Sequence, residues 1–509
     1  MPIIFAIWAN SLAHAQLNFN KVIFEDSIIG KTYVQLGLYN DYFFYIGDRL
    51  GTKKLSGHLL DYNGTVLQRL DSIGTDWLKS YKIVKESLIR VTDSTYAFIA
   101  YVDDYYSAIV EFNPETNRLE QKVGLDRSSE SAVVISKLVK LPGGRVAIIE
   151  YDDGFWGGDQ FTSINVYNDN WKRINSIAHG DSLSLFFHPC YFAQNADSTY
   201  TVTGELDDYS DPQYRKTIQF RRRFDPTLKL FETKYLDFKN DFRSSNANCI
   251  ENKNRHLIYA GEAFFKMPDS LYYDNESLII DVDPDFSHIV WQKKLNNPIL
   301  NSSLHLFNRG LFQGSNASEF YTYGNIKRRL YDFPDNSYVY KFNEHGDSLW
   351  MRTFRYAILD TNAISGQYLL DGKLTKDNKL LFAGIGSDSF SKSYHTWLFQ
   401  IDEEGCIIPD CNKLITKDPG NNPEHFITVY PSIVTNRQIC LLSSLNINQN
   451  LEVSLYTREG RFLNKIQIFL EAGMQFILKL PDQLAYGNYI IRMIDDMGRK
   501  QTENIIITE

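Results

Sequence analysis

Short runs in which apolar and polar residues alternate recur along most of the chain, and a polar turn ends each run. In one representative unit, residues 132–141 predict a first strand and residues 142–144 a tight Pro-Gly-Gly turn. Residues 145–151, 161–167 and 171–177 predict three further strands of the same unit. Four antiparallel strands joined by turns are typical of one blade of a β-propeller, so the alternation predicts an all-β fold.

The turn between the third and fourth strands of each unit begins with Asp or Asn and sets the repeat length. Successive turns lie about 52 to 60 residues apart, which is the length expected of propeller blades. Six full repeats and a shorter first one that begins near Tyr33 predict seven blades. Six or eight stay open as alternatives, because a terminal strand can close the ring. The turn residues are Asp61, Asn113, Asn168, Asp225, Asp283, Asn343 and Asp402.

A hydrophilic hinge at residues 417–423 ends the repeat. The chain beyond it contains six or seven short alternating runs separated by Gly and Asn turns, which predict a small Ig-like β-sandwich. We therefore predict a β-propeller at residues 16–412, a linker at 413–423 and a β-sandwich at 424–509. Few contacts are expected between the two cores, because a hydrophilic hinge separates them.

Charge and hydropathy exclude several classes of protein. The net charge is −9 and no basic stripe is present, which argues against binding to nucleic acid and to anionic membranes. Beyond the first residues, no segment approaches the ~20 apolar residues of a membrane-spanning helix. Residues 1–15 are apolar and end in Ala13-His14-Ala15, which predicts a signal peptide that lacks its basic start. The alternative is a buried first strand.

The loop lengths predict one interaction face. The first and third turns of each unit are short, whereas the second loops and the connections between units are long and lie together on the other face. Several second loops begin with acids that would converge on one mouth of the ring. They suggest a cationic ligand or calcium, although no Asp-rich calcium loop is present, and a solvated acidic rim is the alternative. These acids are Asp48, Asp103, Asp104, Asp152, Asp153, Glu205, Asp207, Asp208, Glu262 and Asp388.

No catalytic sequence motif accompanies these acids. The chain has no G-x-S-x-G elbow, H-E-x-x-H, Walker loop or strand-led G-x-G-x-x-G. We therefore predict non-enzymatic binding of an extracellular glycan or protein, with no cofactor. One alternative is a hydrolase or lyase that uses paired carboxylates such as Asp103-Asp104, provided that two carboxyl groups lie ~5–9 Å apart. The other alternative is a purely structural surface-layer component.

Five cysteines are present, and none forms a C-x-x-C pair or lies near histidines at zinc spacing. Cys406 and Cys411 bracket Ile-Ile-Pro-Asp, and this spacing suits a disulfide and two free thiols equally well. Cys190, Cys249 and Cys440 are predicted to be buried small hydrophobic residues.

Three segments of the repeat share a further pattern, at residues 257–261, 340–350 and 380–384. They match runs of the type G-Y-x-x-A-G and K-x-D-x-x-G-x-x-x-W. In this respect the repeat resembles the secreted β-propeller proteins of Bacteroidota, whose blades are similar to those of quinoproteins. The adjacent cysteine pair typical of quinone-dependent alcohol dehydrogenases is absent, which argues against a quinone cofactor.

The tail carries four elements in order, at residues 429–431, 453–461, 484–492 and 498–507. They resemble Y-P-N-P, L-Y-x-x-x-G-R, L-x-x-G-x-Y and the terminal strand of the C-terminal sorting domain of type IX secretion cargo, although Ile433 replaces the second Pro. The motif residues are Tyr430, Pro431, Gly460, Arg461, Gly487 and Tyr489. The alternative is an unrelated Ig-like adhesive domain.

The resemblance implies passage through the periplasm and delivery to the medium or the outer cell surface by the type IX machinery. Gly405 to Cys411 is also similar to the G-C-x-x-P-x-C closure found between such propellers and their tails. We therefore predict a Cys406–Cys411 disulfide.

Asp-Ser followed by Ile, Leu or Thr occurs seven times. The tripeptide resembles the O-glycosylation acceptor of exported proteins in the same bacteria. The alternative explanation is that Asp-Ser recurs because both residues favour turns. The serines are Ser27, Ser72, Ser94, Ser182, Ser198, Ser270 and Ser348.

Overall fold

The structure is a computed structural model. It describes residues 20–23, 31–39, 41–49, 54–73, 81–83, 87–102, 106–125, 133–152, 161–180, 185–211, 214–238, 241–266, 273–295, 305–327, 336–358, 367–387, 394–407, 427–430, 433–434, 437–443, 449–458, 460–470, 475–481 and 483–507. These residues form strands and turns, with one 3₁₀ turn at Pro142–Gly144 and no α-helix among them, so the predicted all-β class is confirmed. None of the described segments is a helix long and apolar enough to cross a membrane.

Seven antiparallel sheets follow one another along the described residues before position 408, and we number them in chain order. Sheet 1 contains β2 (Lys31–Leu38), β3 (Tyr42–Arg49), β4 (Lys54–Asp61) and β5 (Val66–Ile73). Sheet 2 contains β6 (Tyr81–Ile83), β7 (Ile89–Arg90), β8 (Tyr96–Val102), β9 (Tyr106–Asn113) and β10 (Arg118–Leu125). Sheet 3 contains β11 (Val133–Lys140), β12 (Val146–Asp152), β13 (Phe161–Tyr167) and β14 (Arg173–Gly180).

The remaining four sheets continue the same pattern. Sheet 4 contains β15 (Leu185–Gln194), β16 (Tyr200–Asp211), β17 (Tyr214–Phe224) and β18 (Leu230–Leu236). Sheet 5 contains β19 (Asp241–Glu251), β20 (Leu257–Lys266), β21 (Tyr273–Val282) and β22 (Ile289–Lys294). Sheet 6 begins with β23 (His305–Gln313), β24 (Glu319–Lys327), β25 (Asn336–Asn343) and β26 (Ser348–Ile358). Sheet 7 contains β27 (Gln367–Leu374), β28 (Leu380–Ser387), β29 (Tyr394–Ile401) and the N-terminal β1 (Asn20–Ile23).

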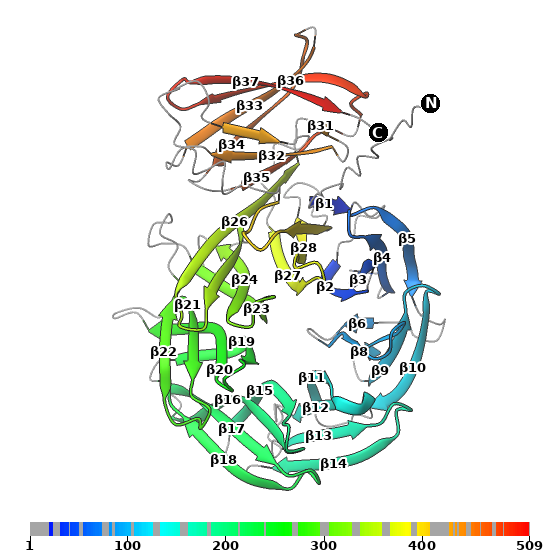
Figure 1. The fold of residues 1–509 in the computed structure, drawn as a ribbon, viewed down its shortest axis with the longest axis vertical. Coiled ribbons are helices and arrows are strands. Elements are labelled where there is room, and N and C mark those ends of the chain that lie inside the picture. The colour runs from blue at the N-terminus through cyan, green and yellow to red at the C-terminus, as the bar shows by residue number, and fades with distance from the viewer. Residues whose placement is uncertain are drawn as a thin grey trace, which may run out of the picture.

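The seven sheets form a ring, with the fourth strands β5, β10, β14, β18 and β22 on its outside (Figure 1). Each pair of neighbouring sheets shares one buried apolar cluster, including sheets 7 and 1, where Leu381 and Leu398 pack with Phe43 and Tyr45. A single sheet exposes apolar side chains on both faces, and stacking against two neighbours buries them. This arrangement is a β-propeller.

The N-terminal strand closes the ring. β1 lies antiparallel to β29, with Asn20 opposite Phe399 and Ile23 opposite Thr396, so sheet 7 combines the first described strand with three strands from residues 367–401. The structure thus contains a terminal strand that closes the ring, which the repeat count allowed but did not assign. Residues 1–15 lie outside the described residues, and the signal peptide stays a prediction.

The predicted turn residues form the turns expected of them. The Oδ1 atom of Asp225 accepts the backbone amides of Thr227 and Lys229 at 2.8 and 2.9 Å. Asp61, Asn168, Asn343 and Asp402 accept amides two and four residues on in the same way. The repeat register read from these residues is confirmed.

Two of the second loops are shorter than the sequence suggests. The second loops were expected to be long, but Asp207 pairs with Thr217 and Asp211 with Tyr214, so β16 and β17 stay paired as far as these last two residues. β20 and β21 likewise pair out to Lys266 and Tyr273. Strand pairing is favoured here because it provides hydrogen-bond partners for backbone N–H and C=O groups that would be hydrated in a loop.

The tail forms two further layers. One is a five-stranded sheet of β31 (Ile433–Val434), β37 (Lys500–Ile507), β36 (Gly487–Asp495), β33 (Gln449–Thr457) and β34 (Phe462–Leu470). The other consists of β35 (Gln475–Lys479), β32 (Gln438–Ser443) and β30 (Ile427–Tyr430). One apolar cluster lies between the two layers.

The second layer of the tail is continuous with sheet 6 of the ring (Figure 1). β26 pairs with β35 in parallel, with Phe354 opposite Gln475 and Ile358 opposite Lys479. Alternate residues of β32 enter different cores: Leu441 packs in the tail, whereas Leu442 packs with sheets 6 and 7. The expectation of few contacts between the two parts is therefore wrong, because this layer is buried on both faces. The exact linker, 413–423, lies outside the described residues, and the domain boundaries stay predictions.

Candidate functional site

Six of the ten acids predicted to form a ligand face lie on described strands. Asp48 is on β3, Asp152 is on β12, and Asp207 and Asp208 are on β16, where only the backbone is described. The side chains of Glu205 and Glu262 are described. Asp103, Asp104, Asp153 and Asp388 lie outside the described residues.

Glu205 and Glu262 occupy the same position in neighbouring sheets. Each is the sixth residue of the second strand, in β16 and β20, and each follows a glycine. Their exposed fractions are 0% and 3%, so both carboxyl groups are buried within the ring and neither contributes to an exposed acidic rim. Glu205 lies opposite Gln219 of β17, which is also buried.

A network of buried polar groups lies close to Glu262. The Tyr338 hydroxyl donates to Asn308 Oδ1 and lies 3.4 Å from Ser277 Oγ. Asn308 Nδ2 donates in turn to the carbonyl of Gly261, at 2.9 Å, and thereby links sheets 6 and 5. Burial raises the pKa of Tyr338 and the nearby Glu262 charge adds to this effect, so the hydroxyl stays protonated and acts as a donor. The network holds neighbouring strands together.

Other polar side chains near the inside of the ring also join neighbouring sheets. Asp371 Oδ2 of β27 accepts the amide of Leu36 in β2 at 2.8 Å. Asn325 Oδ1 accepts the amide of Leu369 at 2.7 Å, and Lys137 Nζ donates to the carbonyl of Cys190 at 2.6 Å. Buried polar groups of this kind specify how the strands align, because leaving them unpaired costs more than the bond gains. Their role here is to position the sheets.

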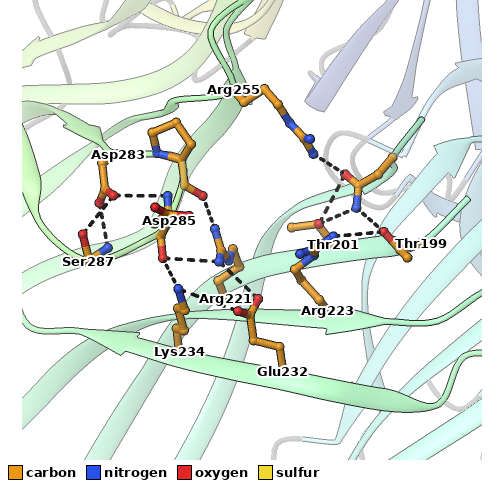
Figure 2. Close-up of polar contacts among 12 residues, drawn as sticks. Thr199, Thr201, Arg221, Arg223, Glu232, Lys234, Arg255, Asp283, Asp285 and Ser287 are labelled. Carbon is orange, nitrogen blue, oxygen red and sulfur yellow. Dashed lines mark hydrogen bonds and ion pairs between the residues drawn. The ribbon is translucent and has the colours of Figure 1, made fainter. Parts of the chain in front are cut away.

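The sequence reasoning assigned no role to the arginines of β17, which form a contact between sheets 4 and 5 (Figure 2). Arg221 donates to the carbonyl of Pro284, and its Nη2 atom lies 3.1 Å from Glu232 Oε2 and 3.3 Å from the carbonyl of Asp285. Lys234 Nζ donates to the same Asp285 carbonyl at 2.6 Å. These two cations bind the turn between β21 and β22 of the next sheet.

The run Arg221-Arg222-Arg223 is visible in the sequence, but the Pro284 and Asp285 carbonyls lie 63 and 64 residues from Arg221, in a different sheet, so no local signal identifies this contact. On the other side of the view in Figure 2, Arg223 Nη2 lies 3.4 Å from Thr199 Oγ1. The same atom lies 3.4 Å from Asp197 Oδ2. Arg255 Nη2 from sheet 5 donates to Asn195 Oδ1 at 3.4 Å. The first turn of sheet 4 is therefore also held by neighbouring arginines.

The outer strand of sheet 4 presents two exposed aromatic side chains. Phe231 and Tyr235 of β18 are each 53% exposed. The guanidinium carbon of Arg223 lies 5.3 Å from the centre of the Phe231 ring, within the range of a cation–π contact. An exposed ring beside a fixed cation offers a flat apolar face and a hydrogen-bond donor to a ligand.

Exposed apolar side chains recur at the start of several outer strands. In addition to Phe231, the second residue of β5, β14, β22 and β26 is apolar and exposed. These residues are Leu67, Ile174, Val290 and Leu349. Single exposed apolar residues are common on protein surfaces, so the aromatic pair on β18 is the distinctive feature.

The remaining predicted residues fall at turns and strand ends. Gly460 and Arg461 lie between β33 and β34, where Gly460 has φ +83°. Gly487 begins β36 with φ +151°, and the hydroxyl of Tyr489 donates to the carbonyl of Ala485 at 2.7 Å. Tyr430 ends β30, and Pro431 lies outside the described residues.

Cys406 forms a disulfide, whereas Cys190, Cys249 and Cys440 are free and buried. Cys411 lies outside the described residues, so the Cys406–Cys411 pairing stays a prediction. Within the described part of the chain, no three His, Cys, Asp or Glu side chains are grouped so that they could hold a metal ion. The proposed calcium site draws on acids outside that part and stays a prediction.

Among the seven candidate glycosylation serines, Ser94, Ser198 and Ser348 have described side chains, and all three are exposed. Ser72 lies on β5, with only its backbone described. Ser27, Ser182 and Ser270 lie outside the described residues.

Comparison with known proteins identifies no family. No protein-family model matches the chain, and no curated protein matches it. Among solved structures, a protein from Lactobacillus plantarum is 10% identical with a TM-score of 0.41, over 71% of this chain and 94% of its own.

Two other structures are similar to a comparable extent. The β-propeller domain of the Trilobed protease from Pyrococcus furiosus is 9% identical with a TM-score of 0.39, over 73% of this chain and 96% of its own. The α-L-arabinofuranosidase of Fusarium graminearum, in complex with arabinobiose, is 10% identical with a TM-score of 0.38, over 63% of this chain and 93% of its own. No activity follows from resemblances of this size.

Proposed function

We propose that the chain is a secreted or cell-surface, seven-bladed β-propeller that binds an extracellular glycan or protein and catalyses no reaction. The observation that carries this proposal is the exposed pair Phe231 and Tyr235 on β18, with Arg223 over the Phe231 ring. Aromatic side chains and arginine supply most of the energy at binding surfaces, because they bury a large area with few rotatable bonds. Seven sheets for seven sequence repeats support the blade count.

The test is binding of residues 16–509 to glycan and extracellular-protein arrays. The double variant Phe231→Ala/Tyr235→Ala should lose its ligand, whereas Leu349→Ala should keep it. Leu349 is a matched control, since it is 46% exposed at the start of the outer strand of another sheet. Unchanged binding by the double variant would remove this surface from the proposal.

The competing function is an extracellular hydrolase or lyase with an acidic site at the mouth of the ring. The two candidate acids with described side chains, Glu205 and Glu262, are buried and so are poorly placed to meet a substrate. This observation favours binding. If the protein binds no glycan and no protein on the arrays, the result would instead favour the other alternative, a structural surface-layer component.

We also propose that the tail is an Ig-like sorting domain recognised by type IX secretion machinery of a Bacteroidota host, after removal of residues 1–15. Support comes from the order of the tail motifs and from Gly460 and Gly487, whose backbone conformations favour glycine. Removal of residues 1–15 would leave β1 intact to close the ring. A reporter fused ahead of residues 424–509 should reach the cell surface, and its retention in the periplasm would refute the assignment.

A further inference from the structure

Two free cysteines meet at the boundary between sheets 4 and 5. Cys190 lies on β15 and Cys249 on β19, which are the first strands of the two sheets. The hydroxyl of Thr203 lies 3.6 Å from the Cys190 sulfur and 3.8 Å from the Cys249 sulfur. Two strands that are not neighbours in any sheet therefore place their sulfur atoms on one shared hydroxyl, within one buried cluster.

The surroundings keep this pair in place. Both cysteines belong to one apolar cluster with Leu257 and Tyr259, and their exposed fractions are 5% and 3%. Lys137 of sheet 3 holds the backbone of β15 through the carbonyl of Cys190. Burial raises the pKa of the Cys249 thiol, which disfavours its reactive thiolate form. Because both cysteines are buried, an oxidant reaches them only as the chain folds or opens.

The chain already contains one oxidised cysteine. Cys406 is disulfide-bonded, so the conditions that maintain this bond also act on any other thiol pair that can meet. Cys440 differs from the pair, since it is buried in another cluster with sheets 6 and 7. It provides a matched free cysteine within the same chain.

We propose that Cys190 and Cys249 are a latent cross-linking site that joins β15 to β19 through a disulfide. The oxidant is a small-molecule or protein disulfide. One thiol loses its proton and attacks the oxidant, whose S–S bond breaks to release a first thiol. The second cysteine then loses its proton and attacks the mixed disulfide, which forms the Cys190–Cys249 bond and releases a second thiol. Two protons and two electrons pass to the oxidant.

The cross-link would join two parts of the ring far from its strand closure. Sheet 6 lies between β19 and sheet 7, in which β1 meets β29, and sheets 5 and 6 lie between β15 and sheet 7 (Figure 1). The disulfide would restrict the unfolded chain and stabilise the boundary between sheets 4 and 5. Sheets 4 and 5 also meet through Arg221 and the turn after β21, so the cross-link would fix a boundary that is already aligned.

The test uses residues 16–509 refolded with a mixture of oxidised and reduced glutathione, compared with the same chain refolded in excess reduced dithiothreitol. After denaturation, alkylation and digestion without reduction, mass spectrometry should find a peptide that links Cys190 to Cys249. The oxidised form should also unfold at a higher denaturant concentration than the reduced form, by a larger margin in the wild-type protein than in Cys190→Ser, which keeps the Cys406 disulfide. Cys190→Ser and Cys249→Ser should each abolish the linked peptide, whereas Cys440→Ser should leave it unchanged.

Two outcomes would overturn the proposal. One is quantitative alkylation of Cys190 and Cys249 in the oxidised, folded wild-type protein. The other is a set of linked peptides in which Cys440 pairs with either residue as often as they pair with each other. Both outcomes are read from the wild-type protein, so the result does not depend on whether a serine variant folds.

Discussion

Trp291 packs against Gly346 across the boundary between sheets 5 and 6, where a Cβ atom on the glycine would lie 2.8 Å from the indole ring. The indole nitrogen donates to the carbonyl of Glu344, at 3.0 Å, in the same turn. One sheet further along, the indole nitrogen of Trp350 donates to the carbonyl of Glu403 at 3.0 Å, and Gly405 occupies the position equivalent to Gly346. A tryptophan on the fourth strand thus binds the turn of the following sheet.

This packing predicts the effect of Gly346→Ala on stability. The substitution places a Cβ on a residue at φ +78°, which costs about 1–2 kcal/mol, and also presses it against the Trp291 ring, which adds about 1–3 kcal/mol. Gly460→Ala is the matched control, since φ is +83° and no heavy atom lies within 4 Å of the added Cβ. Denaturant unfolding should show the larger loss for Gly346→Ala, and equal losses would contradict the packing argument.

The shared layer of the tail predicts that the ring depends on it. Deletion of residues 424–509 removes β35 from β26 and uncovers the sheet 6–7 core against which Leu442 and Ile477 pack. Each such buried side chain contributes about 1.5–3 kcal/mol, so the truncated chain should unfold at lower denaturant concentration and bind apolar dyes.

A pair of adjacent residues provides the control for this prediction. Leu442→Ala should speed hydrogen exchange in β26 and β29, because Leu442 packs in the core of sheets 6 and 7. Leu441→Ala should act on the tail instead, because the Leu441 side chain packs between the two tail layers. If both variants speed hydrogen exchange in β26 and β29 equally, the assignment of Leu442 to the core of sheets 6 and 7 and of Leu441 to the tail core is contradicted.

The turn at Asp225 predicts a response to pH. A hydrogen bond from the Thr227 hydroxyl, at 2.6 Å, lowers the pKa of Asp225, and backbone amides add to the effect. The folded-state pKa of Asp225 is lowered, so its ionised carboxylate stabilises the folded protein. This stabilisation is complete at pH values above the ordinary pKa of about 3.9, and it is lost as the pH falls through the folded-state pKa.

Thr227→Val should therefore raise the pKa of Asp225, as measured by carboxyl-carbon NMR, and shift acid unfolding to higher pH. Thr233→Val on the neighbouring strand β18 is the control and should leave the Asp225 titration unchanged. An unaltered Asp225 titration in Thr227→Val would assign the lowered pKa to the backbone amides alone.

Exposure of three Asp-Ser sites predicts where glycan would be found. Ser94, Ser198 and Ser348 are accessible, so we expect at least two of the seven candidate serines to carry glycan in the native host. The intact mass of the secreted protein should exceed that of the bare chain. The triple variant Ser94→Ala/Ser198→Ala/Ser348→Ala should show a smaller excess mass. A wild-type mass equal to that of the processed chain would exclude the modification.

The features that the sequence predicts well are the local ones. Asp225 and its equivalents form turns with amides two and four residues away, so their chemistry is complete within a short segment. The β1–β29 and β26–β35 pairings join segments that are distant in the sequence, and no local pattern encodes them. One signal was present: residues 439–442 are apolar without alternation, which is typical of a strand buried on both faces.

The candidate site is less predictable for a related reason. A glutamate that follows a glycine on a strand reads the same in the sequence whether it faces solvent or, like Glu205 and Glu262, is buried. Its burial depends on the neighbouring sheet. Phe231 and Tyr235 are apolar residues of an ordinary strand pattern, and only the position of β18 on the outside of the ring leaves them exposed.

The pairing of β1 with β29 also sets the order of folding. β1 is synthesised before the strands of sheets 1 to 6, yet its partner, Thr396–Phe399, is made only after sheets 1 to 5 and strands β23 to β26 of sheet 6. Bringing together such distant segments is slow, because the entropy of closing the loop is lost before the contact forms. A chain that folds as it is synthesised would therefore form an open arc of sheets first, and the ring would close only when β29 pairs with β1.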